Sequence, residues 1–202
     1  ENTLDTKLFP WLADHRLGDA AVFPAAGFLE LALAAGRLWR GGEGGLELSD
    51  LGISRPLMLS GRRGRRVRVA VSPDTGRLRV ESRGILSGGD WTRHCQADVR
   101  ALGCPEPAPL DVARPGAFGP ELDAAALYPL AARLGLHYGP AFQTVRQAWL
   151  RQGPEGEELL ARLAGGAGTP EGLLTPPALV DGAFQSLFLL LDRQGASGPR
   201  QA

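Results

Sequence analysis

The feature that most constrains this chain is a long apolar segment, Ala25 to Trp39, which directly follows Pro24. Proline suits the first position of a helix, because the N–H that it lacks would have no intrahelical partner there. The apolar side chains of the segment run almost all round a helix, which is typical of helices buried on most sides. We therefore expect a core helix wrapped by a β-sheet.

The residues after this helix predict an antiparallel sheet. Arg66–Val71 and Arg77–Glu81 alternate polar and apolar residues, and Asp74-Thr75-Gly76 between them is typical of a turn. Trp91 to Ala101 continues the alternation as a third strand. In that strand the alternation places His94 on the solvated face.

The chain divides into two halves around a proline-rich stretch. We assign residues 1–104 to an N-terminal half, 105–120 to a linker and 121–202 to a C-terminal half. The C-terminal half carries a predicted helix, two strands and a second apolar helix, at 121–134, 145–152, 157–163 and 178–192. Two strands cannot cover so apolar a helix, so we expect further strands beyond residue 202 and a first strand upstream of residue 1.

Composition excludes several classes of function. Lys and Arg number 22 and Asp and Glu number 22, so no net charge attracts nucleic acid or an anionic membrane. No apolar stretch reaches the roughly 18 residues of a membrane span, and the N-terminus lacks a signal pattern, so we expect a cytoplasmic protein. Cys95 and Cys104 lack the spacing of a zinc site or a disulfide framework, and we expect no metal.

His15 is the candidate base. Histidine has an unperturbed pKa near neutrality, so one well-placed ring can take a proton from a weak carbon acid and return it. His15 stands nine residues before Pro24, at the entrance of the core helix. The alternative is a capping or loop histidine. His94 is set aside because of its predicted solvated face, and His137 is expected to be a loop residue, although it could line a pocket.

Asp181 is the candidate acid. Asp181 and Gln185 stand four residues apart, so on a helix they share a face and the amide can hold the carboxyl group. The apolar neighbours Val180, Ala183 and Phe184 would raise the pKa of Asp181 by desolvation. That shift favours the protonated form, which can donate to a leaving hydroxyl. The alternative is an aspartate that is stabilised by the dipole at a helix N-terminus.

Two further features concern binding. The backbone N–H groups near Ala25, Ala26 and Gly27 could stabilise a thioester oxygen that gains negative charge. A run of arginines on one strand and its approach could meet an acidic carrier protein, or could simply form a solvated strand face. These residues are Arg62, Arg63, Arg65, Arg66 and Arg68.

The segments that carry these candidates resemble, in order, the signatures of one family. Trp11-Leu12-Ala13-Asp14-His15 through Pro24 resembles H-x-x-x-G-x-x-x-x-P. Gly135–Gln143 resembles G-Y-x-Y-G-P-x-F-Q, and Asp181 to Gln185 resembles D-x-x-x-Q. Trp91-Thr92-Arg93-His94 matches a strand written W-T-x-H. Over almost its whole length the chain thus resembles the dehydratase domains of modular type I polyketide synthases.

The resemblance implies an α+β double hotdog, in which each half wraps an antiparallel sheet around a long apolar helix, with the second half incomplete. His15 would be the base and Asp181 the acid in the loss of water from a 3-hydroxyacyl thioester, which gives a 2,3-enoyl thioester. An acyl carrier protein would deliver the substrate on phosphopantetheine, without a metal or redox cofactor. Neighbouring domains of the same synthase and a homodimer are also implied. The implied supporting and pocket residues are Gln185, Tyr138, Gly139, Pro140, Gly18, Pro24 and Gly27.

Three positions depart from the family's pattern. Asp19 stands in place of a glycine, with Gly18 one place earlier, Leu136 stands in place of a tyrosine, and Pro176 stands in place of a histidine. We expect the carboxylate of Asp19 to lie near the base and to alter activity or its outcome. The same acid–base pair could instead shift a double bond to the 3,4 position or close an ether ring. A catalytically silent domain for dimerisation and carrier docking is the third alternative.

Overall fold

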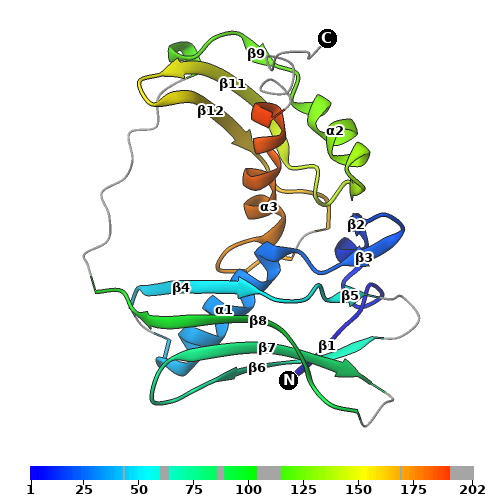
Figure 1. Ribbon diagram of the computed structural model, residues 1–202, viewed down its shortest axis with the longest axis vertical. Helices are drawn as coiled ribbons and strands as arrows, with labels where there is room; N and C mark the ends of the chain where they lie inside the picture. Colours follow the sequence, from blue (N-terminus) through cyan, green and yellow to red (C-terminus); the bar gives the residue numbers. More distant parts are fainter. Residues whose placement is uncertain (43, 60–63, 86–88, 104–114, 169, 192–202) are drawn as a thin grey trace, which may run out of the picture.

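The computed structural model describes residues 1–42, 44–59, 64–85, 89–103, 115–168 and 170–191. Most of the predicted linker, Cys104, Arg62 and Arg63 lie outside these residues, and the division into halves stays a prediction. In the described part, mostly antiparallel strands combine with a few helices (Figure 1).

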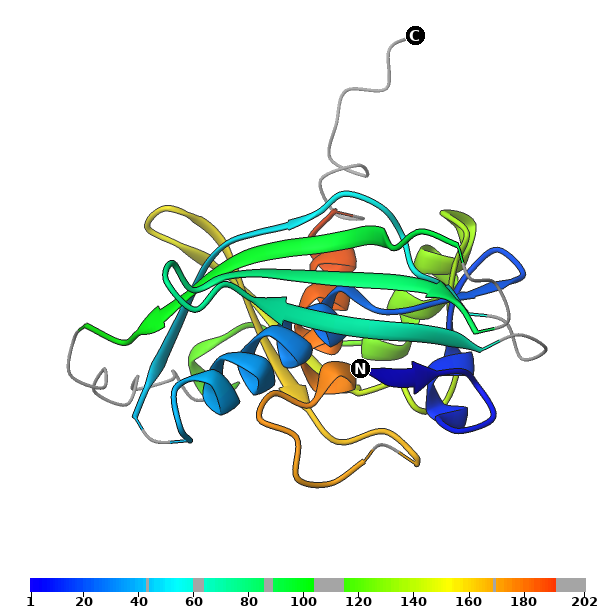
Figure 2. The same cartoon turned by 90° about the horizontal axis from the view of Figure 1, so that it is seen from below.

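The first half wraps a five-stranded sheet around one helix. The helix is α1 (Ala25–Trp39), and the sheet runs in the order β1 (Asn2–Leu4), β6 (Arg65–Val71), β7 (Arg77–Gly84), β8 (Thr92–Ala101) and β4 (Leu46–Ile53). Figure 2 shows α1 along one face of this sheet. A Cβ at Gly36 would lie 2.5 Å from Cγ1 of Val99, so helix and strand approach closely. The predicted core helix and hairpin are confirmed.

Strand β8 departs from simple alternation at His94. Its pairing with β7 passes from Val80 opposite Cys95 to Glu81 opposite Arg93, so His94 is the extra residue of a β-bulge. His94 and Cys95 are therefore both buried, 3% and 0% exposed. The prediction that His94 lies on the solvated face is wrong, because alternation of faces fails at a bulge.

The second half places a helix beside a small sheet. The sheet order is β12 (Gly156–Leu163), β11 (Val145–Gly153) and β9 (Glu121–Leu122). Helix α3 (Pro177–Gln185) contacts β11 and β12, and helical residues resume at 187–191 (Figure 1). The two predicted strands and the second apolar helix are confirmed.

The helix predicted over 121–134 is shorter than expected. Residues 121–122 pair with β11 as strand β9, and the side chain of Asp123 accepts a hydrogen bond from the N–H of Ala125. A 3-10 turn, η3 (Ala124–Ala126), and helix α2 (Leu127–Arg133) follow. Strand pairing and the aspartate cap therefore displace the start of the helix.

A small sheet joins a strand that follows the predicted linker to three strands that precede it. Its order is β10 (Leu136–Tyr138), β2 (His15–Leu17), β3 (Ala20–Val22) and β5 (Met58–Leu59). Strand β10 pairs antiparallel with β2, so Tyr138 lies opposite His15. His137 lies in this strand, exposed, and not in the loop that we expected. The pairing brings the candidate base beside the second half.

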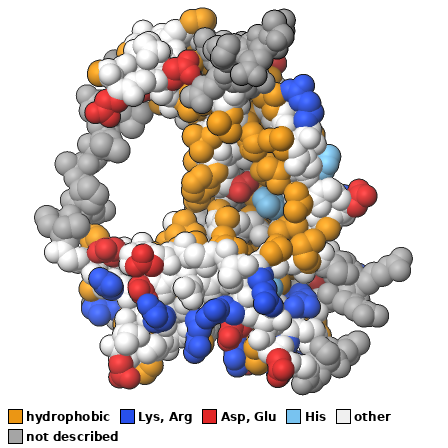
Figure 3. All heavy atoms as spheres, viewed as in Figure 1, with side chains coloured by type: hydrophobic (Ala, Val, Ile, Leu, Met, Phe, Trp, Pro, Cys, Tyr) orange, Lys and Arg blue, Asp and Glu red, His pale blue; other side chains and the backbone are white. Residues whose placement is uncertain are grey.

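One face of α3 and the residues after it is exposed in the described structure. Phe184, Leu187 and Leu191 are its exposed apolar side chains. Figure 3 shows a hydrophobic band in the region of α3, with an acidic and a histidine side chain side by side within it. The further strands that we expect beyond residue 202 stay a prediction. None of the described helices is long and apolar enough to span a membrane.

Candidate active site

The backbone holds His15 in one orientation. The residue follows the 3-10 turn η1 (Pro10–Asp14), and its Nδ1 lies 2.8 Å from the carbonyl oxygen of Val22. Because a carbonyl oxygen only accepts hydrogen bonds, Nδ1 is the donor and carries the proton of the neutral ring. The Nε2 lone pair is therefore available to accept a proton.

Asp181 faces this nitrogen from α3. Its Oδ1 lies 3.8 Å from Nε2 of His15, and the residue is 7% exposed. Burial raises the pKa of the Asp181 carboxyl group, while protonation of His15 and the hydrogen bond from Gln185 act in the opposite direction. The structure thus brings together the candidate base and a carboxyl group whose burial favours the neutral form.

Gln185 fixes the carboxyl group, as the i, i+4 spacing predicts. Its Nε2 donates to Oδ2 of Asp181 at 2.7 Å, and the side chain is buried. An oxygen that already accepts from an N–H is the less favourable place for a proton, so a neutral Asp181 carries its proton on Oδ1. That O–H lies on the side of His15.

Aromatic rings surround the base. The ring centroids of Phe142 and Tyr138 lie 5.1 and 5.6 Å from that of His15, and Trp11 stacks on Phe142 at 5.7 Å. Burial, and secondly Asp181 when it is ionised, raise the pKa of the Tyr138 phenol, which is therefore a neutral hydrogen-bond donor. Trp11 and Phe142 were not predicted as site residues, although both lie in the segments that resemble the family's signatures.

The loop after Tyr138 is bound to the residue before the base. The N–H groups of Gly139 and Ala141 donate to the carbonyl oxygen and to Oδ2 of Asp14, both at 2.8 Å. A Cβ at Gly139 would overlap Cγ of Asp14, so this contact requires glycine. Pro140 is exposed. Sequence reasoning missed Asp14, because its partners lie more than 120 positions away.

The departure at position 19 leaves the hairpin between β2 and β3 intact. Gly18 has a φ of +56°, a left-handed conformation that glycine adopts readily at the first position of a two-residue turn. The Asp19 side chain is fully exposed, and its Oδ1 lies 4.0 Å from Arg16. The expectation that this carboxylate lies near the base is wrong, because the turn directs it into solvent.

At the start of α1, the N–H group of Gly27 is not free to contribute to the expected oxyanion site. Pro24 is the N-cap residue that precedes the helix, with an extended ψ of 150°. The N–H of Gly27 already donates to the Pro24 carbonyl oxygen at 2.9 Å, and a Cβ at Gly27 would lie 2.6 Å from the Phe23 ring. Gly27 therefore serves packing, and a role for the N–H groups of Ala25 and Ala26 stays a prediction.

His94 belongs to a separate buried network. Arg65 Nη2 donates to Oγ of Ser82 at 2.9 Å, the Ser82 hydroxyl lies 2.7 Å from Nε2 of His94, and Nδ1 of His94 lies 3.2 Å from the carbonyl oxygen of Arg55. Burial lowers the pKa of His94, so the ring is neutral and structural. Two of the five arginines in the run thus contact other residues of the protein. Arg65 binds Ser82, and Arg68 forms an ion pair with Glu81 at 2.8 Å.

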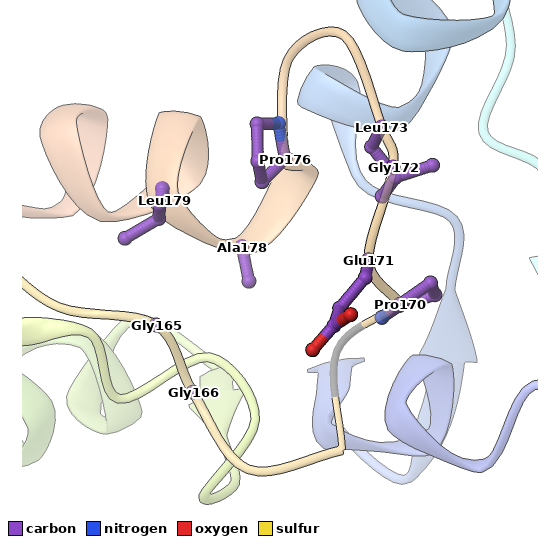
Figure 4. A pocket seen from close by; sticks show the side chains of 9 residues that line it. All are labelled: Gly165, Gly166, Pro170, Glu171, Gly172, Leu173, Pro176, Ala178 and Leu179. Carbon is purple, nitrogen blue, oxygen red and sulfur yellow. The ribbon is translucent and has the colours of Figure 1, made fainter.

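A cavity of about 470 Å³ lies at the start of α3 (Figure 4). Its wall is formed by Gly165, Gly166, Pro170, Glu171, Gly172, Leu173, Pro176, Ala178 and Leu179. Ala178 also packs in the cluster of Phe142, which contacts the His15 ring. Pro176, the third departure from the family's pattern, therefore lines a space close to the candidate site.

Comparison with known proteins identifies the family. The family model "Polyketide synthase dehydratase domain" matches residues 1–83, and "Polyketide synthase dehydratase N-terminal domain" matches residues 106–201. One similar solved structure comes from work on dehydratase substrate selection for the borrelidin and fluvirucin polyketide synthases. Its sequence is 31% identical to this chain, the TM-score is 0.75, and the match covers 92% of this chain and 67% of that chain. The chain belongs to the polyketide synthase dehydratase domain family. The resemblance inferred from the sequence is confirmed.

Two more relatives bear on the fold of this dehydratase domain and on the protein to which such a domain belongs. The dehydratase domain from the terminal module of the rifamycin polyketide synthase is 28% identical, with a TM-score of 0.74, over 93% of this chain and 68% of that chain. This match confirms a partial double hotdog. Polyketide synthase GfsB of Streptomyces halstedii is 34% identical in an alignment of 198 positions, which covers 94% of this chain and 3% of that protein. The chain thus spans a small part of a multidomain relative, which supports neighbouring domains of one synthase.

Proposed function

We propose that the domain removes water from a 3-hydroxyacyl thioester on an acyl carrier protein and forms a 2,3-enoyl thioester. The observation that carries this proposal is the pair of Nε2 of His15 and Oδ1 of Asp181, 3.8 Å apart at a buried site. The pair combines the ring nitrogen that the Val22 contact leaves without a proton in the neutral tautomer with a carboxyl group that burial favours as neutral. Family membership supports the reaction class.

The reaction needs one proton acceptor and one proton donor. Nε2 of His15 takes a proton from carbon 2, whose acidity the thioester increases, and the electrons of that C–H bond form the double bond to carbon 3. The bond from carbon 3 to oxygen breaks, and the proton on Oδ1 of Asp181 converts the leaving hydroxyl into water. Transfer of the proton from Nε2 back to Oδ1, directly or through one water, restores both groups.

Neighbouring groups support these two roles. The Val22 carbonyl oxygen keeps the ring proton on Nδ1 of His15, and Gln185 keeps the proton of Asp181 on Oδ1. The elimination changes no oxidation state overall, so it requires no redox cofactor, and the proposal assigns both proton transfers to His15 and Asp181 without calling on a metal. Delivery on phosphopantetheine and a homodimeric synthase belong to the same proposal.

Product analysis tests the proposal. The full chain is given a synthetic 3-hydroxyacyl thioester and, separately, a 2-enoyl thioester, and the products are analysed by mass spectrometry and NMR. We expect loss of one water from the first substrate and no movement of the double bond in the second. A 3,4 double bond or a cyclic ether would favour the alternative reactions, and no product would favour a silent domain.

Two further measurements test the partners. Carrier delivery predicts a higher kcat/KM for a substrate attached to an acyl carrier protein than for the same acyl group on free pantetheine. Equal values would contradict it. Sedimentation of the full chain tests the homodimer, and a monomer at all concentrations would contradict that part of the proposal.

A further inference from the structure

We infer that Glu30 is a positioning residue for the acid Asp181. The carboxylate of Glu30, on α1, binds the chain segment that directly precedes α3, the helix that carries Asp181. The inference rests on the proposed function. Nothing in the sequence of Glu30 and its neighbours indicates this role, because its partners lie in the other half of the chain.

The Glu30 carboxylate makes three hydrogen bonds to this segment. Oε1 accepts from the N–H of Leu174 at 3.1 Å, and Oε2 accepts from the N–H and the hydroxyl of Thr175 at 2.6 and 2.9 Å. Glu30 lies on the buried face of α1 and is 8% exposed. Hydrogen bonds to a carboxylate are shorter and stronger than neutral ones, and burial strengthens them further. The segment is therefore firmly attached to α1.

The chain between this attachment and the acid is conformationally restricted. Thr175 is followed by prolines at positions 176–177, whose rings restrict φ, and α3 begins there. Figure 4 shows the segment from Pro170 to Pro176 passing the cavity and entering α3. The first turn of α3 is also held from the side, since Oγ1 of Thr144 donates to the carbonyl oxygen of Ala178 at 3.1 Å. The position of Thr175 therefore sets where α3 starts and where Asp181 lies.

The chain just before the same helix fixes the base. Nδ1 of His15 is bound to the carbonyl oxygen of Val22, which lies three residues before α1. The backbone at the end of β3 thus holds the base, and Glu30 on α1 holds the segment that leads to the acid, so the short stretch from Val22 to Glu30 controls the separation of the two. Because a misplacement of about 1 Å can cost about 100-fold in rate, this control has kinetic consequences.

Glu30→Gln tests the inference in the full chain, with Glu47→Gln on the exposed side of β4 as the matched control. The amide that replaces the Glu30 carboxylate would place an NH2 group against a backbone N–H and so loosen the segment. Two rates are measured: water elimination, which needs base and acid, and deuterium exchange at carbon 2 of a thioester without a 3-hydroxyl group, which needs only the base. We expect elimination to fall about 10- to 100-fold, exchange to stay within about twofold, and Glu47→Gln to match wild type.

The ratio of the two rates separates positioning from folding. A purely structural role would lower both rates by one factor, and that result, like a Glu30→Gln variant with wild-type rates, would overturn the inference. If Glu30→Gln does not fold, Thr175→Val removes only the hydroxyl bond, and we expect a smaller fall in the same ratio. An unchanged ratio in a folded Thr175→Val would then overturn it. Failure of the proposed function itself would appear earlier, as a wild-type chain that eliminates no water.

Discussion

Replacing Asp181 by Asn would separate proton donation by the acid from proton removal by the base. Asn keeps an oxygen for the 2.7 Å hydrogen bond from Gln185 but has no acidic proton to donate. Loss of a general acid costs about 10²- to 10⁴-fold in rate. This equals about 3 to 5 kcal/mol of barrier. We expect elimination to fall by this factor, whereas deuterium exchange at carbon 2 continues through His15.

The same variant has a predictable effect on stability. Burial raises the pKa of Asp181 in the folded state above its unfolded value, so the folded state binds this proton more tightly. The stability that the proton contributes is present at low pH and is lost as pH rises through the folded pKa. Asn carries no charge at any pH. The unfolding temperature of Asp181→Asn near neutral pH should therefore equal or exceed that of wild type, with a weaker decline as pH rises.

Three assays on the full chain check this prediction. Elimination is followed with a synthetic 3-hydroxyacyl thioester, exchange by NMR in deuterium oxide, and stability by thermal unfolding over a pH series. Asp19→Asn is the matched control, because its side chain is fully exposed, and we expect wild-type behaviour in all three assays. Loss of both reactions from folded Asp181→Asn, or a lower unfolding temperature near neutral pH, would refute the reasoning.

Three further predictions concern other residues. His15→Ala should lose elimination and exchange together, each by about 10²-fold or more, and retained exchange in a rate assay would show that another group is the base. Gly27→Ala should lower the free energy of unfolding by about 1 to 3 kcal/mol, because the added Cβ would meet the Phe23 ring, and unchanged denaturant unfolding would contradict this. Ser82→Ala should cost about 1 to 3 kcal/mol by leaving Nε2 of buried His94 without a partner, with activity per folded molecule unchanged, and a loss of specific activity would contradict a purely structural network.

The local sequence pattern was sufficient to predict the main helices and strands, but not the irregularities within them. Helix α1 and the hairpin of β6 and β7 follow from the period of their apolar residues, which depends only on neighbours in sequence. The bulge at His94 depends on the register with β7, and the shortened helix after residue 122 depends on pairing with β11. Both were predicted wrongly, because strand register is a tertiary property.

The candidate site shows the same division. The residue types and the i, i+4 spacing were enough to select His15, Asp181 and Gln185. Their convergence depends on the pairing of β10 with β2 and on the contact between α1 and α3, which join residues far apart in the chain. Asp14 and Glu30 were missed for this reason, since each binds backbone groups more than 120 positions away. No sequence pattern near either residue signals such a partner.

The central claim is that His15 and Asp181 act together on one bound substrate. A double-mutant cycle on the elimination rate tests it most directly, with His15→Ala, Asp181→Asn and the combined variant measured in the full chain. Groups that act as a unit in one step have strongly non-additive effects. We predict that the combined variant is no slower than the slower single variant. Single losses that multiply in the combined variant would show that the two residues act independently, and would contradict the account.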